Sequence, residues 1–305
     1  MRSDFVRQQS NICRFMTNES WVILSPIEQS IKRKIEAIGV PLKDWDISIN
    51  YGIKTGFNDA FIISGAKRDE ILANCKTENE RQKTTELIRP ILRGRDIKRY
   101  HYEYADLYLI ATFPSKHYDI EKYPTIKNYL LSFGLERLEQ SGKKYDSFSA
   151  RKKTNNKWFE TQDSISYWED FNKPSIAWIE LTDEAKFAYC ENMIVLNTVF
   201  FLTGEKLFDI LGMLNSTLIL FYFRNCLGTT SGVGTNRWLK YTIEQLPLFY
   251  NAPKELEELV KELLKCKDNM YDSAQIDKKI DYLIFTLFGL STEEIDYVNA
   301  YKTKL

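Results

Sequence analysis

Two stretches organise this chain of 305 residues: Asn50-Tyr-Gly-Ile-Lys-Thr-Gly-Phe-Asn-Asp-Ala-Phe-Ile-Ile-Ser64 and Ile88-Arg-Pro-Ile-Leu-Arg-Gly-Arg-Asp-Ile-Lys-Arg-Tyr100. Each mixes glycine turns and donor side chains with β-forming apolar residues. The first stretch predicts a hairpin across 45–64, with strands at 45–49 and 61–64. Neither stretch holds a usable catalytic constellation. The two stretches therefore suit a surface that binds a polar, anionic partner without catalysing a reaction on it.

The composition is that of a globular protein, with 44% hydrophobic, 28% charged and 14% aromatic residues. The length allows a real core, in one large domain or two modest ones. The aromatic content favours β-rich packing over a helical bundle. Because 42 basic residues balance 42 acidic ones, any basic face for an anionic partner must be local.

The cysteine and histidine content argues against a metal site. Five cysteines are scattered without a Cys-x-x-Cys pair, and only two histidines accompany them. We expect free thiols in a reducing cytosol and no bound metal. No apolar run follows the opening residues, and the apolar stretch 207–223 is interrupted by polar residues, so we expect a cytoplasmic protein without a membrane partner.

The apolar pattern predicts an α+β fold, in which helices flank a mixed β-sheet. A helix is expected from Ser25-Pro26 to Gly39, where apolar residues keep helical spacing. The other predicted helices are 67–86 with a loop near Lys76, 123–136 and 207–225, and the other predicted strands are 107–113, 176–179, 187–189 and 195–202.

The composition changes at Asn251, which is expected to cap a helix with Pro253 in its first turn. Apolar stripes then predict a C-terminal helical hairpin, and a third helix begins near Ser291. This tail has 8 Lys against 11 Asp plus Glu, a balance of 8 − 11 = −3. Residues 143–157 instead have 6 basic side chains against 1 acidic one, 6 − 1 = +5. Charge is thus sorted along the chain.

Motifs for the obvious reactions are missing from the sequence. The catalytic loop of an adenine methyltransferase requires a Pro-Pro dipeptide, and this sequence contains none. It also lacks a glycine-rich turn typical of S-adenosylmethionine sites. A metal-dependent nuclease built from Asp170, Glu184 and Lys186 is the least favoured function, because 182–185 is better interpreted as a solvated turn between two strands.

Two clusters in the opening stretches are candidates for DNA contact. Lys54 and Thr55 suit phosphates and Asn58 suits an adenine edge, next to glycines that let the backbone approach closely. The alternative to DNA contact is a surface hairpin whose polar side chains are merely solvated. The second cluster, in which arginines can bind guanine or phosphate, consists of Arg93, Arg95 and Lys98. Its alternative is a structural ion pair with Asp96.

Two further loops carry donor side chains. The first is a basic run that precedes Trp158, in which we expect DNA contacts from Arg151, Lys152, Lys153, Asn155, Asn156 and Lys157. The second is a glycine-rich loop, in which we expect them from Thr230, Ser231, Thr235, Asn236 and Arg237. The alternatives are a merely solvated face for the first loop and a closing hairpin for the second.

Short segments across residues 20–300 resemble the TaqI-like C-terminal specificity domain of type IIG restriction–modification enzymes and N6-adenine DNA methyltransferases. They are Gly52–Gly56, Asn58, Ala60–Ile63, Arg89-Pro90, Leu92–Ile97, Lys157–Glu160, Lys173-Pro174, Ala177-Trp178, Asn197, Leu211–Ser216, Gln245–Leu248, Ile280–Leu283 and Phe288–Ser291. The resemblance implies a mixed α/β domain that reads double-stranded DNA for an N6-adenine methyltransferase domain or subunit, with or without a nuclease. The comparison extends to type I specificity subunits, which join recognition domains to docking helices.

The resemblance also implies a division of the chain. Residues 1–20 would be a linker from a missing upstream domain, 21–250 the DNA target-recognition domain, and 251–305 a helical tail. No cofactor is expected in this chain; S-adenosylmethionine, and Mg²⁺ for a nuclease, would belong to the catalytic partner. The alternative is a protein-docking module that acts through the tail helices.

Overall fold

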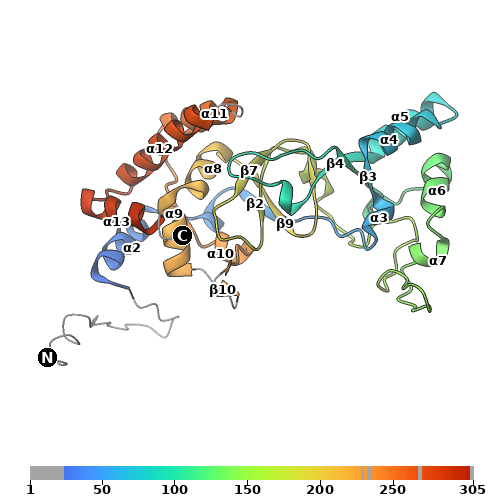
Figure 1. Ribbon diagram of the computed structural model, residues 1–305, viewed down its shortest axis with the longest axis horizontal. Helices are drawn as coiled ribbons and strands as arrows, with labels where there is room; N and C mark the ends of the chain where they lie inside the picture. The colour runs from blue at the N-terminus through green and yellow to red at the C-terminus, as the bar shows by residue number, and fades with distance from the viewer. Residues whose placement is uncertain (1–23, 228–229, 232–234, 267–269, 303–305) are drawn as a thin grey trace. The chain divides into compact units, whose positions relative to one another are not determined.

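The computed structural model describes residues 24–227, 230–231, 235–266 and 270–302 (Figure 1). The predicted linker at 1–20 lies outside the described residues. The chain forms two compact units. The first unit comprises 1–47, 180–187 and 204–305, and the second comprises 48–179 and 188–203. Helices and mixed or antiparallel sheets make up an α+β fold, as the sequence predicted.

One four-stranded sheet of the second unit has the order β3-β5-β4-β8. Its strands are β3 (Ile62–Ser64), β4 (Ile88–Leu92), β5 (Leu107–Ile110) and β8 (Ile194–Val195). The central strand β5 runs antiparallel to both β3 and β4, while β8 runs parallel to β4. The sheet is therefore mixed, and it joins the two opening stretches of sequence through β3 and β4.

The other four-stranded sheet has the order β2-β9-β6-β7. Its strands are β2 (Ile47–Tyr51), β6 (Ser175–Ile179), β7 (Phe187–Cys190) and β9 (Val199–Gly204). Five of the six residues of β9 are buried, as expected for a strand covered on both faces.

The predicted hairpin across 45–64 is wrong, because β2 and β3 lie in different sheets. After β2, the Gly52 amide donates to the Val199 carbonyl at 2.9 Å, and Ile53 pairs in parallel with Leu196. A Cβ on Gly52 would lie 2.0 Å from the Leu196 oxygen. Only glycine permits this close backbone approach, which takes the chain away from a local hairpin. The same contacts break the predicted strand 195–202 into β8 and β9.

The helices of the second unit are α3 (Asn58–Phe61), α4 (Gly65–Ala73), α5 (Glu78–Leu87), α6 (Pro124–Leu131) and α7 (Leu135–Leu138). The prediction of helix with a loop near Lys76 is confirmed, since Ser64 and Thr77 cap α4 and α5. The predicted helix 123–136 is interrupted at Gly134, which has a φ of 88°. The core below these elements contains stacked rings of Phe113, Phe171 and Phe201.

The first unit contains α2 (Pro26–Ile38), β1 (Val40–Pro41), α8 (Leu207–Asn215), α9 (Thr217–Tyr222), β10 (Thr230–Ser231), β11 (Thr235–Asn236), α10 (Lys240–Ile243) and β12 (Pro247–Leu248). The predicted N-terminal helix is confirmed as α2, with a capping box between Ser25 and Glu28. The predicted single helix 207–225 is instead split at Ser216. The Ser216 side chain caps α9, while the Asn215 amide binds the backbone of Phe187.

The predicted helical tail is confirmed as α11 (Lys254–Lys265), α12 (Met270–Leu287) and α13 (Thr292–Lys302). Pro253, not Asn251, is the residue that precedes α11. Helix α11 packs against α12 and α8, and α13 packs against α9 (Figure 1).

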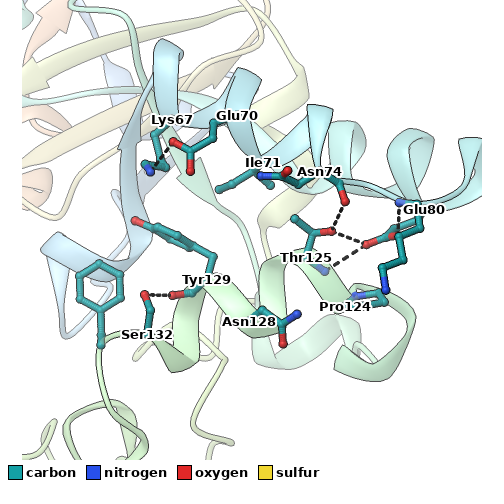
Figure 2. A pocket seen from close by; sticks show the side chains of 12 residues that line it. Lys67, Glu70, Ile71, Asn74, Glu80, Pro124, Thr125, Asn128, Tyr129 and Ser132 are labelled. Carbon is teal, nitrogen blue, oxygen red and sulfur yellow. Dashed lines mark hydrogen bonds and ion pairs between the residues drawn. The ribbon is translucent and has the colours of Figure 1, made fainter.

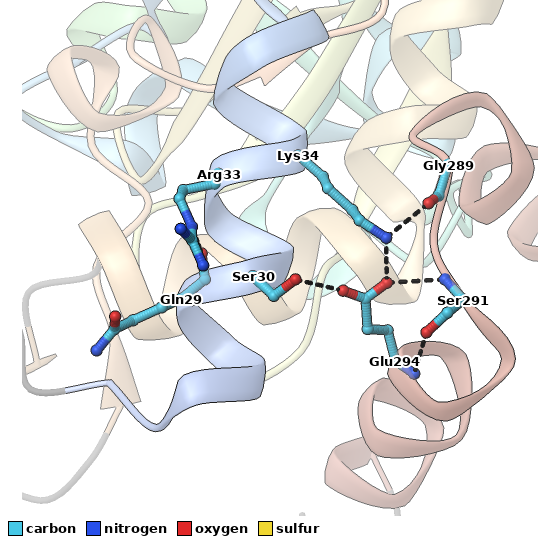
Figure 3. A network of polar contacts seen from close by, with 7 residues as sticks. All are labelled: Gln29, Ser30, Arg33, Lys34, Gly289, Ser291 and Glu294. Atoms are coloured by element: carbon cyan, nitrogen blue, oxygen red, sulfur yellow. Dashed lines mark hydrogen bonds and ion pairs between the residues drawn. The ribbon is translucent and has the colours of Figure 1, made fainter.

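A polar network ties α13 to α2 within this unit (Figure 3). The Glu294 carboxylate accepts hydrogen bonds from Ser30 at 2.7 Å, Lys34 at 2.6 Å and the Ser291 amide at 2.7 Å. Burial raises the pKa of Glu294, but these bonds outweigh it and lower the pKa overall. Helices α2 and α13 are thus joined by a carboxylate that stays charged.

Among the described residues, no single helix is long and apolar enough to cross a bilayer. The pair 207–215 and 217–227, bent by 60°, reaches that length and composition only when taken together.

Candidate nucleic-acid interface

Arg151 is the structural centre of the basic run. Its side chain is 3% exposed and donates to the carbonyl oxygens of Leu138, Trp158, Thr55 and Glu160. The guanidinium also lies 4.8 Å from the centroid of the Phe61 ring. The structure therefore gives Arg151 an internal role, instead of the DNA contact that the sequence suggested. Its hydrogen bonds join three separate segments of the second unit.

The burial of Arg151 changes its acidity without removing its charge. Burial lowers the pKa of Arg151 to about 10, although the nearby Glu160 raises it. The guanidinium is therefore cationic at neutral pH, when it makes charge-assisted bonds to neutral carbonyls. Such bonds are stronger than those between neutral groups, so Arg151 fixes the turn around Thr55 firmly.

The turn at 54–58 divides its polar residues between interior and surface. Thr55 is 1% exposed; its hydroxyl donates to Asn58 Oδ1 at 2.6 Å and accepts from the Phe57 amide. Gly56 has a φ of 78°, and a Cβ there would lie 2.9 Å from Gln162 Oε1. Lys54 and Asn58 are exposed. The predicted DNA contact by Thr55 is thus replaced by a role within the turn.

The basic loop shows the same division. Lys152, Lys153, Asn155 and Lys157 are exposed. The Asn156 amide instead donates to the carbonyl oxygens of Thr161 and Gln162, which holds the loop to the protein. Asn156 therefore supports the loop, and its four exposed neighbours provide the surface.

Arg137 joins this surface, and the sequence analysis missed it. Its guanidinium lies 4.6 Å from the centroid of the Phe57 ring and its side chain is exposed. It lies in the short helix α7 between Glu136 and Glu139, so no local pattern distinguishes it. Only the position of α7 over the 54–58 turn brings it into the cluster.

We call the exposed cations around Arg151 the cationic rim, and they are Lys54, Arg137, Lys152, Lys153 and Lys157. All but Lys153 are immediate sequence neighbours of Arg151 or of a residue whose carbonyl Arg151 binds. Exposed acids of the same segments are Asp59, Glu136 and Asp146. A single buried cation therefore organises a surface on which basic side chains predominate.

The second predicted cluster is largely engaged in internal pairs. Arg93 binds Asp96 with both Nε and Nη2, at 3.0 and 2.7 Å. Lys98 pairs with Glu103 at 3.2 Å. Burial raises the pKa of Asp96, but hydrogen bonds from Arg93 outweigh it and lower the pKa overall. The ion-pair alternative is thus observed at Arg93, whereas Arg95 is exposed.

The two opening stretches meet at one connection. Leu196 pairs with Ile53, and its amide donates to the Leu92 carbonyl at 3.0 Å. The next amide, that of Asn197, donates to the Ile53 carbonyl at 3.1 Å. The turns that carry Lys54 and Arg93–Arg95 therefore flank the same segment between β8 and β9.

The candidate residues of the glycine-rich loop lie in the first unit. Thr230 pairs with Asn236 and Ser231 with Thr235 in the β10–β11 hairpin; the side chains of Thr230, Ser231 and Thr235 lie outside the described part of the structure. Asn236 is buried. Arg237 binds Glu180 at 2.6 Å, so its charge is already compensated within the protein.

The residues of the nuclease alternative pair locally. Glu184 binds Lys186 at 3.1 Å, while Asp170 binds Lys173 at 2.7 Å. Within residues 24–227, 230–231, 235–266 and 270–302, no group of three or more His, Cys, Asp or Glu side chains is arranged to hold a metal ion.

Comparison with known proteins identifies a matching family and structures with a similar fold. The family model of the TaqI-like C-terminal specificity domain matches residues 89–248, just over half of the chain. The fold is similar to the type IIL restriction–modification enzyme MmeI, solved in complex with DNA, with a TM-score of 0.50, 15% identity and coverage of 87% of this chain and 35% of that one. For the type IIG restriction endonuclease BpuSI the TM-score is 0.45 at 13% identity, covering 86% and 33%. The chain thus spans about a third of each structure.

Proposed function

The chain belongs to the family of TaqI-like C-terminal specificity domains, and on this premise we propose that it recognises a double-stranded DNA target for a restriction–modification enzyme. The catalytic reaction would be carried out by another domain or subunit. The similar MmeI structure contains DNA and is about three times as long as the matched region, which is consistent with this division of labour.

The observation that carries the proposal is the cationic rim around Arg151. Phosphates dominate the affinity of proteins for DNA, and lysine and arginine bind them without regard to sequence. Lys54, Lys152, Lys153 and Lys157 would supply these contacts. Arg137 stacks on Phe57 and presents a planar donor array that also suits phosphate oxygens.

Sequence readout needs donors that reach base edges. Arg95 and Asn58 are the exposed candidates in the two opening stretches. Arg93 and Thr55 are engaged inside the protein, and the Thr55 hydroxyl donates to Asn58 Oδ1, which keeps a second lone pair for a base. Arginine binds guanine with two hydrogen bonds and asparagine binds adenine in the same way. We therefore assign base readout to Arg95 and Asn58, and positioning to the rim.

The proposed catalytic partner is an N6-adenine methyltransferase domain or subunit that binds S-adenosylmethionine. The adenine specificity, the cytoplasmic location and docking through the tail helices 251–305 belong to the same proposal. Co-expression of the chain with a candidate methyltransferase, followed by mapping of methylated bases, would test the partner directly.

The DNA-binding proposal is tested by fluorescence anisotropy with a random-sequence duplex over a range of salt concentrations. The logarithm of affinity should fall with log salt by about 0.9 for each phosphate contact, because counterions are released. A triple variant, Lys152→Ala, Lys153→Ala and Lys157→Ala, should bind more weakly and with a shallower slope.

The triple variant Lys265→Ala, Lys278→Ala and Lys279→Ala is the matched control, since these lysines are exposed on α11 and α12 in the acidic tail. It also removes three charges, without touching the rim. Equal losses in the rim and tail variants, or an affinity that does not depend on salt, would contradict the proposal.

A further inference from the structure

A pocket of about 690 Å³ lies between α4 and α6 in the second unit (Figure 2). Its size is within the range of roughly 300–1,000 Å³ that small-molecule sites occupy. The residues that line it are Lys67, Glu70, Ile71, Asn74, Lys76, Glu80, Pro124, Thr125, Asn128, Tyr129, Ser132 and Phe133. None of the DNA-contact candidates named from the sequence is among them.

Three of the four charged side chains that line the pocket are engaged within the protein, and the fourth, Lys76, is exposed. At one end, Lys67 binds Glu70 at 2.5 Å. At the other, the buried Glu80 accepts from the Lys76 amide, the Thr125 amide and the Thr125 hydroxyl, at 3.0, 3.0 and 2.7 Å (Figure 2). Burial raises the pKa of Glu80, but these hydrogen bonds have the larger effect and lower the pKa overall. Away from Lys76, the pocket therefore suits neutral polar groups better than an ion.

The middle of the pocket combines aromatic faces with neutral polar groups. The Tyr129 and Phe133 rings are in edge contact, with centroids 5.4 Å apart. Asn128 is exposed and Tyr129 is half-buried, so the Asn128 amide and the Tyr129 hydroxyl are available to a ligand at this pocket. Burial raises the pKa of Tyr129, and Glu70 raises it further, so its hydroxyl remains a donor. Stacking surface with neutral donors and acceptors suits a flat heterocycle.

The aromatic wall continues to the cationic rim. Phe133 makes an edge contact with Phe57, with centroids 5.7 Å apart, and the guanidinium of Arg137 covers the Phe57 ring. Phe57 follows Lys54 and Gly56 in the 54–58 turn. A ligand that arrives along the rim therefore meets a continuous path of rings into the pocket.

We propose that this pocket receives an unpaired nucleobase from the bound DNA, which stacks on Tyr129 and is hydrogen-bonded by the Asn128 amide. The inference rests on the proposed DNA-binding function and adds a site to it. Proteins that bind extruded or single-stranded bases combine aromatic stacking with hydrogen bonds to the base edge. The cationic rim would hold the phosphates of the same DNA.

The test uses the full chain and two probes. The first compares a fully paired duplex with the same duplex carrying one unpaired adenine. The wild-type chain should bind the second about tenfold more tightly, as one base–aromatic stack provides. Asn128→Ala and Tyr129→Leu should abolish this preference and leave the affinity for the paired duplex unchanged. Gln82→Ala, exposed on α5 and outside the pocket, is the control.

The second probe is adenosine, whose base protons should show saturation-transfer signals with the wild-type chain and lose them with Asn128→Ala. Circular dichroism checks that each variant is folded. If Tyr129→Leu is unfolded, Asn128→Ala alone is sufficient to test the pocket. If the wild-type chain binds paired DNA but shows neither preference nor adenosine signal, the pocket assignment is wrong and the proposed function stands. If it binds no duplex at all, the proposed function fails, and absence of the adenosine signal would then reject the pocket separately.

Discussion

The guanidinium of Arg151 donates a hydrogen bond to the carbonyl oxygen of Thr55, 96 residues earlier in the chain, at a distance of 2.8 Å. Both residues have side chains typical of DNA contacts, and both are buried. Their function is to shape the surface that their neighbours present. The structure thus separates the buried residues that support this surface from the exposed residues that are available to a partner.

Replacing Arg151 by methionine should destabilise the protein strongly. The change keeps much of the side-chain volume but removes the donors for four carbonyl oxygens. Each buried acceptor left without a donor costs about 1–3 kcal/mol, so the free energy of unfolding should fall by at least about 3 kcal/mol. Urea denaturation measures it. Lys152→Met should stay within about 0.5 kcal/mol, and equal midpoints for both variants would disprove an internal role for Arg151.

Removing Lys152 and Lys153 together should weaken binding to all DNA sequences alike. Both are exposed and lie beside Arg151, where they suit phosphates. The slope of log affinity against log salt should become shallower by about 2, one for each lost contact. Anisotropy titrations with several unrelated duplexes check this. A loss confined to one sequence would show that these lysines read bases.

Arg95→Ala should change which sequences bind and leave stability intact, because the side chain is exposed. Loss of a contact to guanine costs about 1–3 kcal/mol at one position of the target. Selection from a random duplex library, followed by sequencing, measures the change. Arg93→Ala is the informative comparison, since it removes the two side-chain hydrogen bonds to the buried Asp96 and leaves only the one from the Arg93 amide; it should lower the melting temperature as well. An unchanged selection profile for Arg95→Ala would remove it from the readout.

Asp209→Asn should stabilise the protein at alkaline pH. Burial first, and Glu257 second, raise the pKa of Asp209 to about 6 from an ordinary value of 3.8. Its Oδ1 is buried and has no hydrogen-bond partner in the described part of the chain. The folded state therefore binds a proton at a higher pH than the unfolded state does. The free energy of unfolding rises as the pH falls from about 6 to about 4. Above that window, the charged carboxylate is unfavourable in the folded protein.

At pH 8 the asparagine variant should gain about 1–2 kcal/mol, after allowance for partial exposure. The gain should shrink at pH 5, where the wild-type carboxyl is largely protonated. Urea midpoints at the two pH values measure both quantities. A gain that is the same at both pH values would show that Asp209 does not titrate in this window.

Local signals predicted much of the secondary structure. The start of α2 follows from Ser25, Pro26 and Glu28, whose caps act over three residues. The two helices α4 and α5 and the helical tail follow in the same way from caps and apolar spacing. Strand pairing did not follow: the proximity of β2 and β3 in sequence predicted a hairpin, whereas contacts with Leu196 place them in different sheets.

The sequence by itself determined the α+β class, the helical tail, the sorting of charge and the resemblance to specificity domains, because caps, periodicity and motifs act over a few residues. The tertiary structure decided which basic residues are available. Arg151 is internal and Lys152 is exposed, although they are adjacent in the sequence. Arg137 joins the rim through its contact with Phe57 and through the bond from Arg151 to the carbonyl of the next residue, Leu138. Burial depends on carbonyls and rings contributed by distant segments, and that information becomes specific only when the chain has packed.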